Sequence, residues 1–299
     1  MTNGLADPVW WEFAVRGVML RGTVQGRADH RSSDAAVVAV HGGPGVDGGG
    51  LRHVLAPLAE RAALVVPDLR GHGRSDLASS SSWTLDDWAD DLAVVIDKLA
   101  LHRPVVVGVS FGGWVALRYA ARHPEQLGSL VVAATTARLP TVEEGAERMR
   151  TLGGPASAAT WRAVHADSSV EATPAFGKHV QTLMATRQPG SELAAVRAAQ
   201  IRTPQVNQYF TPLFSQLDLT DDARQTRCPV TVVVGEQDPL TTPELAVATT
   251  DACPGPVRLR IIPNAAHDLL TDAPDTLLAE ITIALTAREI SAGRPPTNP

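Results

Sequence analysis

Residues 108–112 read Gly-Val-Ser-Phe-Gly; they follow an apolar run that begins at Pro104 and lead into a helix-like stretch that reaches His123. A strand that turns this sharply into a helix has no space for side chains two positions before and after the serine, so glycine is required at both. The serine takes a strained backbone conformation and points its hydroxyl outward at the helix N-terminus. This arrangement predicts that Ser110 is a nucleophile above the edge of a sheet.

Short apolar runs recur along the chain and indicate strands, with two more expected on either side of a turn at Gly17. The runs are rich in valine and do not alternate with polar residues, which is typical of parallel strands covered on both faces. They occupy residues 35–40, 62–66, 104–109 and 130–134, and further strands are expected at residues 229–234 and 257–262. Helix-like segments separate them, at residues 84–99, 112–123, 243–251 and 274–289. The pattern predicts an α/β fold with a mostly parallel central sheet flanked by helices.

The stretch from residue 138 to residue 216 has a different composition. It is rich in Ala, Ser and Thr with scattered Pro and Gly, and it lacks the valine runs. We expect it to form several short helices inserted after about the sixth strand. The chain is therefore expected to consist of a core, residues 1–137 and 217–299, and a helical cap, or lid, at residues 138–216 that covers Ser110.

The charge balance excludes several classes of partner. The chain has 26 Lys and Arg against 32 Asp and Glu, a net charge of −6, whereas nucleic acids and anionic membranes attract a basic face. The first residues lack the basic and apolar regions of a secretory signal, and the longest uncharged apolar stretch is too short to cross a bilayer. We expect a cytoplasmic protein that acts on a small molecule, and the oligomeric state stays open.

The chain also lacks the usual signatures of a metal site. It has neither an HExxH motif nor a close pair of cysteines, since Cys228 and Cys253 are its two cysteines, and zinc sites are commonly built from such groups. We therefore expect no metal and no cofactor.

A serine hydroxyl needs a base to accept its proton, and the base needs an acid that orients it. In the order nucleophile, acid, histidine, both partners follow Ser110 in the chain. His267 lies in a loop directly after the strand 257–262, and Asp238 lies directly after the strand 229–234. We therefore predict His267 as the general base and Asp238 as the acid, with Glu236 as the alternative acid.

The negative charge that develops on the substrate oxygen needs hydrogen-bond donors. One predicted donor is the backbone N–H of Phe111, directly after the nucleophile. The second should come from the loop after the strand 35–40, which reads His-Gly-Gly-Pro-Gly at residues 41–45. We predict the N–H of Gly43, with Gly42 as the alternative.

The same loop also matches the sequence pattern of a different kind of site, one that binds a dinucleotide. Residues 43–48 match the glycine fingerprint of dinucleotide-binding domains, and Asp68 stands 20 residues further on, where a ribose-binding carboxylate is expected. Pro44 argues against this interpretation, because proline has no N–H to offer a pyrophosphate. An NAD-dependent oxidoreductase is therefore an alternative that we disfavour, and a non-catalytic ligand-binding protein of the same fold is another.

Together these residues resemble an α/β-hydrolase fold serine hydrolase, and the resemblance covers nearly the whole chain. The sequence of residues 41–45 is similar to the oxyanion loop of the proline iminopeptidase branch. Residues 68–75 resemble the family's turn after the following strand, and residues 265–267 with 272–274 resemble its catalytic-histidine loop and the start of its last helix.

The resemblance to proline iminopeptidases has departures. Those enzymes carry Gln where this chain has Leu69 and Trp where it has Phe111. Their cap supplies acidic residues that bind the free amine of the substrate. The candidates here are Glu143, Glu144, Glu147, Glu171 and Glu192.

The turn at residues 71–75 is shared with esterases, lactonases and carbon–carbon-bond hydrolases of the same fold. We therefore expect a metal-free serine hydrolase that cleaves a small amide or ester through an acyl-enzyme and resembles proline iminopeptidase-type aminopeptidases. An esterase, a lactonase or a carbon–carbon-bond hydrolase is the alternative.

Overall fold

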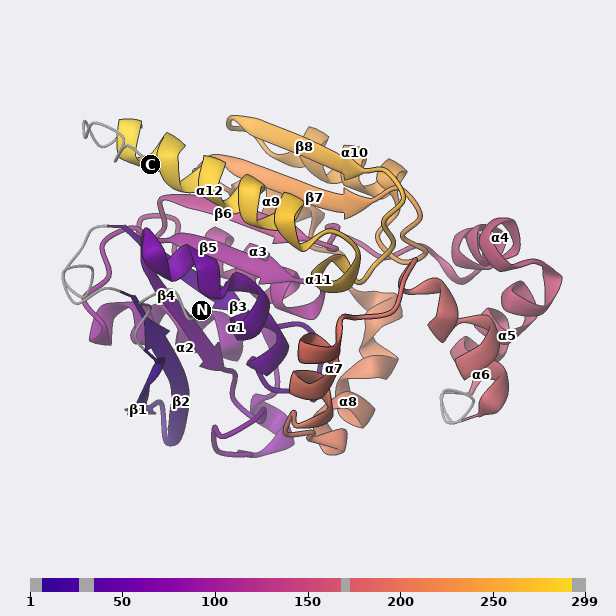
Figure 1. Ribbon diagram of the computed structural model, residues 1–299, viewed down its shortest axis with the longest axis horizontal. Coiled ribbons are helices and arrows are strands. Elements are labelled where there is room, and N and C mark those ends of the chain that lie inside the picture. The colour runs from indigo at the N-terminus through magenta and orange to yellow at the C-terminus, as the bar shows by residue number, and fades with distance from the viewer. Residues whose placement is uncertain (1–6, 27–34, 168–172, 292–299) are drawn as a thin grey trace.

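The computed structural model describes residues 7–26, 35–167 and 173–291, which form an eight-stranded sheet flanked by helices (Figure 1). The strands lie in the order β1-β2-β4-β3-β5-β6-β7-β8. The first two strands pair antiparallel with each other, β2 pairs antiparallel with β4, and the remaining pairs are parallel. The strands are β1 (Val9–Val15), β2 (Val18–Gln25), β3 (Ala36–Val40), β4 (Ala63–Asp68), β5 (Val105–Val109), β6 (Ser129–Ala133), β7 (Val230–Gly235) and β8 (Val257–Ile262).

The valine runs form parallel strands because both of their faces are covered. Successive residues of a strand point to opposite faces, so Val38 and Val40 pack in one hydrophobic cluster and Val37 and Ala39 in another. Helices α2 (Leu85–Lys98), α3 (Phe111–Arg122), α9 (Thr220–Gln225) and α10 (Pro243–Ala252) cover the first face. Helices α1 (Gly49–Leu55) and α12 (Pro274–Ser291) cover the second, with the short α11 (Leu269–Asp272) and η2 (Ala56–Glu60).

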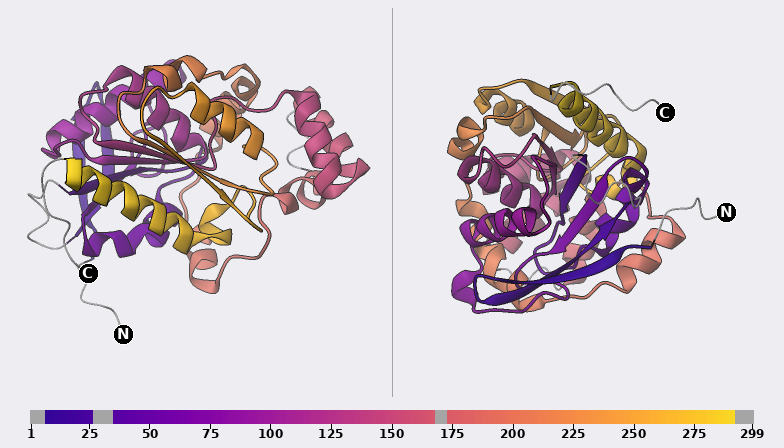
Figure 2. Two further views of the ribbon diagram at one scale, coloured as in Figure 1. Left: turned by 90° about the horizontal axis from the view of Figure 1, so that it is seen from above. Right: turned by 90° about the vertical axis from the view of Figure 1, so that its left-hand side faces the viewer.

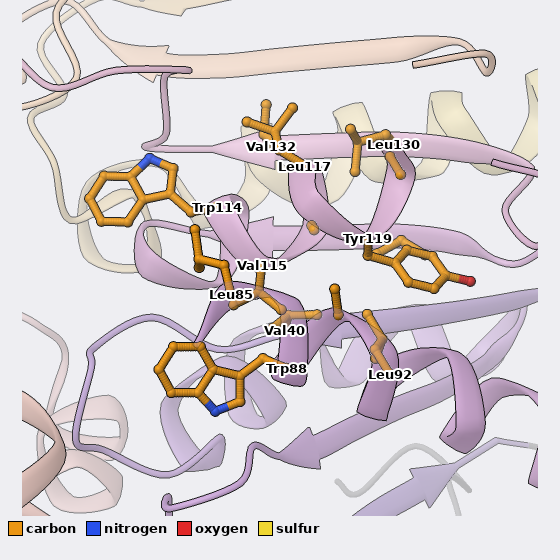
Figure 3. Close-up of a cluster of buried hydrophobic side chains, with 14 of the residues drawn as sticks. Val40, Leu85, Trp88, Leu92, Trp114, Val115, Leu117, Tyr119, Leu130 and Val132 are labelled. Carbon is orange, nitrogen blue, oxygen red and sulfur yellow. The ribbon is translucent and has the colours of Figure 1, made fainter. Parts of the chain in front are cut away.

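The first cluster holds α3, the helix that follows Ser110, in place. Figure 3 shows Trp88 of α2 and Trp114 of α3 among the aliphatic side chains that separate these helices from the sheet. Phe111, the first residue of α3, is fully buried there and lies 5.0 Å from Trp88, ring centroid to ring centroid. The start of α3 is therefore anchored by an aromatic side chain directly after Ser110.

The stretch between β6 and α9 is helical, and we call residues 138–216 the inserted segment. It contains α4 (Val142–Gly153), α5 (Pro155–Ala166), α6 (Pro174–His179), η5 (Gln181–Leu183), α7 (Ser191–Ala198), α8 (Pro204–Phe210) and η6 (Thr211–Gln216). Helices α4 to α6 project from the carboxyl end of the sheet, as Figure 1 and the left view of Figure 2 show. They pack on a small hydrophobic cluster of their own, which includes Met149, Trp161 and Val180.

The predicted fold class is confirmed. The four valine runs correspond to β3 to β6, and the strands expected at residues 229–234 and 257–262 correspond to β7 and β8. The turn predicted at Gly17 joins β1 and β2, with Arg16 and Gly17 at positive φ, 47° and 83°. Thr84, the first residue of the helix-like segment expected at residues 84–99, is the N-cap of α2, where its side chain accepts a hydrogen bond from the N–H of Asp87. Pattern alone was enough here because these elements depend on local sequence and on burial of whole faces.

None of the helices built from residues 7–26, 35–167 and 173–291 is both long and apolar enough to cross a membrane. Within the same ranges, no group of three or more His, Cys, Asp or Glu residues is arranged to hold a metal ion.

Candidate active site

Ser110 stands at the turn from β5 into α3 with a strained backbone, φ 53° and ψ −122°. The two flanking glycines permit this turn. A Cβ atom on Gly108 would lie 2.4 Å from the carbonyl oxygen of Gly112, and one on Gly112 would lie 2.3 Å from the carbonyl oxygen of Val40. Neither position can carry a side chain, which is the requirement that the sequence pattern predicted.

The structure brings Ser110, His267 and Asp238 into one hydrogen-bonded chain. Ser110 Oγ lies 2.9 Å from His267 Nε2, and His267 Nδ1 lies 2.9 Å from Asp238 Oδ2. A carboxylate can only accept, so Nδ1 carries the proton and Nε2 is left to accept from the serine hydroxyl. The alternative acid Glu236 is exposed, and its carboxylate faces the N–H of Asn264 at 3.4 Å.

Asp238 is fully buried and is held by residues that the sequence analysis did not single out. The Thr241 hydroxyl donates to Asp238 Oδ2 at 2.5 Å, and the N–H groups of Leu240 and Thr241 donate to Oδ1 at 2.8 Å. A hydroxyl three residues after a turn aspartate is the local signal that could have revealed this contact.

These contacts set the charge of the pair. Burial raises the pKa of Asp238, but His267 and the hydrogen bonds from His267 and Thr241 outweigh it and hold that pKa below its usual value. Burial lowers the pKa of His267, and the carboxylates of Asp238 and Asp268 outweigh it and raise that pKa above 6.5. The acid is therefore ionised when the histidine is neutral, as a base requires.

The two predicted oxyanion donors belong to different segments next to Ser110. Phe111 begins α3, so its N–H belongs to the first turn, which has no acceptor within the helix. Gly42 and Gly43 both line a cavity that contains Ser110, and a Cβ on Gly42 would lie 3.5 Å from Ser110 Cβ. Gly43 also lines a second cavity at the serine, which Gly42 does not.

A buried histidine orders the loop that carries these glycines. His41 Nε2 accepts the N–H of Leu69 at 3.2 Å, which leaves Nδ1 to donate to the carbonyl oxygen of Gly42 at 2.8 Å. Burial lowers the pKa of His41, so the neutral ring that this pattern needs is favoured. His41 was not among the predicted site residues, because only the folded chain shows what its nitrogens contact.

The carboxylate that a dinucleotide would need is already in use. Asp68 is fully buried, and its two oxygens accept the N–H groups of Gly48 at 3.0 Å and Arg74 at 2.9 Å. It therefore ties the glycine-rich loop to the turn at residues 71–75. A buried carboxylate so engaged cannot reach a ribose hydroxyl.

Two cavities meet at Ser110 and His267. The first, of about 620 Å³, is mainly apolar; its walls include Trp114, Leu139, Trp161, Val164 and Phe214. The second, of about 760 Å³, has more polar and charged side chains in its walls, including Gln181, Thr182, Arg187, Arg197 and Gln200, and we call it the polar cavity. Residues of the inserted segment line both.

The glutamates considered for an amine site lie elsewhere. Glu143, Glu144 and Glu147 form ion pairs with Arg162, Arg138 and Arg150, respectively. Neither these three nor Glu192 lines either cavity. Glu171 lies outside the described residues. In contrast, His165, which the sequence gave no reason to place at the site, lines the apolar cavity, with its ring 4.2 Å from that of Trp161, centroid to centroid, and tilted by 46°.

Comparisons with known proteins place the chain in a family. A sequence profile of the alpha/beta hydrolase fold matches residues 35–274. Pimeloyl-[acyl-carrier protein] methyl ester esterase of Chromobacterium violaceum is 28% identical over 246 residues, which are 77% of this chain and 86% of that protein.

A second relative matches over a shorter region. 2-Hydroxymuconate semialdehyde hydrolase of Pseudomonas sp. strain CF600 is 37% identical over 98 residues, so the match spans 32% of this chain and only 35% of that protein. Among solved structures, proline iminopeptidase of Mycobacterium smegmatis superimposes with a TM-score of 0.76 at 20% identity, over 95% of this chain and 100% of that one. This last similarity concerns the fold.

Proposed function

The chain belongs to the alpha/beta hydrolase fold family of hydrolases, and from this premise we propose that it cleaves carboxylic esters with an apolar acyl group. The observation that carries the proposal is the hydrogen-bonded chain from Ser110 through His267 to Asp238, with an apolar cavity that opens onto the serine. Residues 1–137 and 217–299 act as the catalytic core, and the inserted segment acts as a cap that shapes the substrate site.

In the proposed reaction Ser110 Oγ attacks the ester carbonyl carbon while His267 Nε2 accepts its proton. The C–O bond to the alcohol then breaks, and His267 returns the proton to the leaving oxygen. Water attacks the acyl-enzyme by the same route, which releases the acid and restores Ser110. Asp238 orients the imidazole and stabilises its protonated form throughout.

The tetrahedral intermediates place a negative charge on the former carbonyl oxygen. The N–H groups of Phe111 and Gly43 are proposed to receive it, because one belongs to the start of α3 and the other borders both cavities beside Ser110. Donors of this kind, already oriented before the reaction, typically contribute about 10²–10³ each in turnover.

The acyl group is assigned to the apolar cavity because aromatic and aliphatic side chains make up most of its walls. The indole N–H groups of Trp114 and Trp161 donate to the carbonyl oxygens of Thr136 and Val142, so both rings present carbon surface. Among the described residues that line this cavity, none is acidic. A free substrate amine would be buried there without a counter-ion, which is unfavourable. The alcohol portion is assigned to the polar cavity.

We therefore expect a p-nitrophenyl ester of a medium-chain acid, such as the hexanoate, to be hydrolysed with a kcat/KM at least about 100-fold above that of prolyl p-nitroanilide. Initial rates on a panel of aryl esters, lactones and aminoacyl anilides measure this difference. A prolyl anilide that is turned over as well as the esters would overturn the ester assignment in favour of an aminopeptidase.

A pair of cap variants tests where the acyl chain lies. Val164 of α5 lines the apolar cavity, while its neighbour Ala163 is exposed and does not. Val164→Trp should reduce the preference for octanoate over acetate by about tenfold or more, because the added ring fills space that the longer chain needs. Ala163→Trp is the matched control and should leave the preference as it is.

The proposed esterase activity should fall at low pH, because His267 then becomes protonated. A protonated imidazole cannot accept the proton of Ser110, so kcat/KM falls up to about tenfold per pH unit below the pKa of the base. Asp238 and Asp268 raise the pKa of His267 above 6.5 against the effect of burial, so the half-maximal point should lie above pH 6.5. A pH profile of kcat/KM measures this, and His165→Gln should leave that point unmoved. A half-maximal point below pH 6 would contradict the assignment.

A further inference from the structure

The residue after the histidine is bound by the inserted segment. Asp268 accepts a two-pronged ion pair from Arg197 of α7, with Nη1 to Oδ2 at 2.6 Å and Nη2 to Oδ1 at 2.7 Å. Arg197 Nη1 also lies 3.0 Å from the Thr271 hydroxyl, which itself donates to Asp268 Oδ2 at 2.7 Å. The Asp268 and Arg197 side chains are 23% and 28% exposed, so the pair is partly shielded from water.

Three further hydrogen bonds join the inserted segment to the residues after His267. The N–H of Asp268 donates to the carbonyl oxygen of Met184 at 2.7 Å, and Arg187 Nε donates to the carbonyl oxygen of Thr271 at 2.7 Å. The N–H of Thr186 donates to the carboxylate of Asp272 at 3.0 Å. The loop that carries His267 is thus held by Asp238 of the core on one side and by residues 184–197 of the inserted segment on the other.

The charged groups around this loop come from several elements. Asp238 follows β7, Asp272 ends α11, and Asp47 belongs to the loop after β3 and accepts the N–H of Ile201. Glu236 also follows β7 and accepts the N–H of Asn264. The inserted segment contributes Arg197, Arg187 and Arg148, the last of which donates to the carbonyl oxygens of Glu236 and Asp238. Of these groups, Arg197 is the cation that pairs with the carboxylate next to His267.

We propose that Arg197 is a positioning residue of the reaction: from the inserted segment it holds Asp268, and through Asp268 it fixes the place and the electrostatic surroundings of His267. The inference rests on the proposed function, because it takes His267 as the base. Without Arg197, the uncompensated carboxylate of Asp268 would favour the protonated imidazole; without that carboxylate, the guanidinium would favour the neutral one. The pair therefore makes the competence of the base depend on the docking of the inserted segment.

The experiment is the pH profile of kcat/KM, with one aryl ester, for Arg197→Gln, Asp268→Asn and the double variant. Arg197→Gln should move the acid limb to higher pH, so that kcat/KM falls about fivefold more at pH 6 than at pH 8. Asp268→Asn should move the limb to lower pH, and the double variant should return it close to the original position. Asp268 is the N-cap of α11, where its side chain accepts the N–H of Thr271. Asparagine also caps helices well, so the start of α11 is preserved in Asp268→Asn.

Two further variants separate this role from simple bracing of the structure. Arg197→Lys keeps the positive charge and should leave the acid limb in place. Arg150→Gln breaks an exposed ion pair of α4 whose residues line neither cavity, and it should leave the acid limb in place too. If the ion pair only braced the fold, every Arg197 and Asp268 variant would have a lower thermal stability or a lower kcat. The acid limbs of Arg197→Gln and Asp268→Asn would then not move in opposite directions.

The inference is overturned if Arg197→Gln and Asp268→Asn leave the limb unmoved, or if both move it in the same direction. Failure of the proposed function has a different signature, namely a wild-type chain that does not hydrolyse aryl esters, or a Ser110→Ala variant that still does. Each result therefore addresses one of the two proposals.

Discussion

Ser110→Ala is expected to reduce kcat for aryl esters by about 10⁴–10⁶-fold while the protein stays folded. In the proposed mechanism the hydroxyl oxygen is the atom that attacks, and Ser110 Oγ lies 2.9 Å from His267 Nε2. Alanine takes the same backbone conformation at the same strain, since it too has a Cβ atom at φ 53°. The unfolding temperature should therefore change little, which separates loss of the nucleophile from loss of the fold.

A fluorophosphonate probe gives a second readout for the same variant. The probe should label one serine in the wild-type chain and none in Ser110→Ala. Ser82→Ala is the matched control, because Ser82 lies in an exposed 3-10 turn and its hydroxyl bonds only to the carbonyl oxygen of Ser79 among the described residues. Unchanged labelling or hydrolysis in Ser110→Ala would refute the assignment of the nucleophile.

Asp238→Asn is expected to lower kcat by about 10⁴-fold through the tautomer of His267. The amide oxygen can keep the bonds from the N–H groups of Leu240 and Thr241, so the amide NH₂ takes the place of Oδ2 and faces His267 Nδ1. An imidazole that accepts at Nδ1 carries its proton on Nε2, where it points at Ser110 and cannot receive the serine proton.

Glu236→Gln supplies the matched control for this change. It removes a carboxylate two residues away that the sequence also offered, but one that is exposed and contacts the N–H of Asn264. Its kcat should stay within about threefold of wild type. A loss in Glu236→Gln that equals the loss in Asp238→Asn would show that the two carboxylates had been assigned wrongly.

The ester assignment depends on the absence of an acidic side chain among the described residues that line the apolar cavity. The relatives are consistent with more than one chemistry. One relative is named as a methyl ester esterase and another as a semialdehyde hydrolase, while a structure of the same fold is a proline iminopeptidase. The fold supports all three, because function in such folds depends on the site. The walls that face Ser110 come partly from the inserted segment, which is where substrate choice should be altered.

The glycine-rich loop illustrates how one local pattern fits two sites. Residues 43–48 match a dinucleotide fingerprint in one dimension. In three dimensions Gly43 borders Ser110, while Gly48 and Asp68 hydrogen-bond to each other. The interpretation turned on Pro44, whose missing N–H was visible in the sequence, and the burial of Asp68 supplied the second reason.

Much of the fold could be predicted because it follows from short-range rules. The strands β3 to β6 are marked by runs that are apolar on both faces, and the turn at Ser110 is marked by glycines that no other residue can replace. Chain order then suggested His267 and Asp238, since strands of a parallel sheet end at the same edge. These features are encoded within a few residues of where they act.

Contacts between distant residues could not be predicted in this way. Arg197 and Asp268 are 71 residues apart, and the bonds of His41 and Asp68 depend on which backbone groups the fold brings to them. The glutamates of the inserted segment looked equally available in the sequence, but those described pair with arginines or face away from the cavities. A side chain's role at such a place is set by its neighbours in space, and a single sequence carries no record of them until the chain is folded.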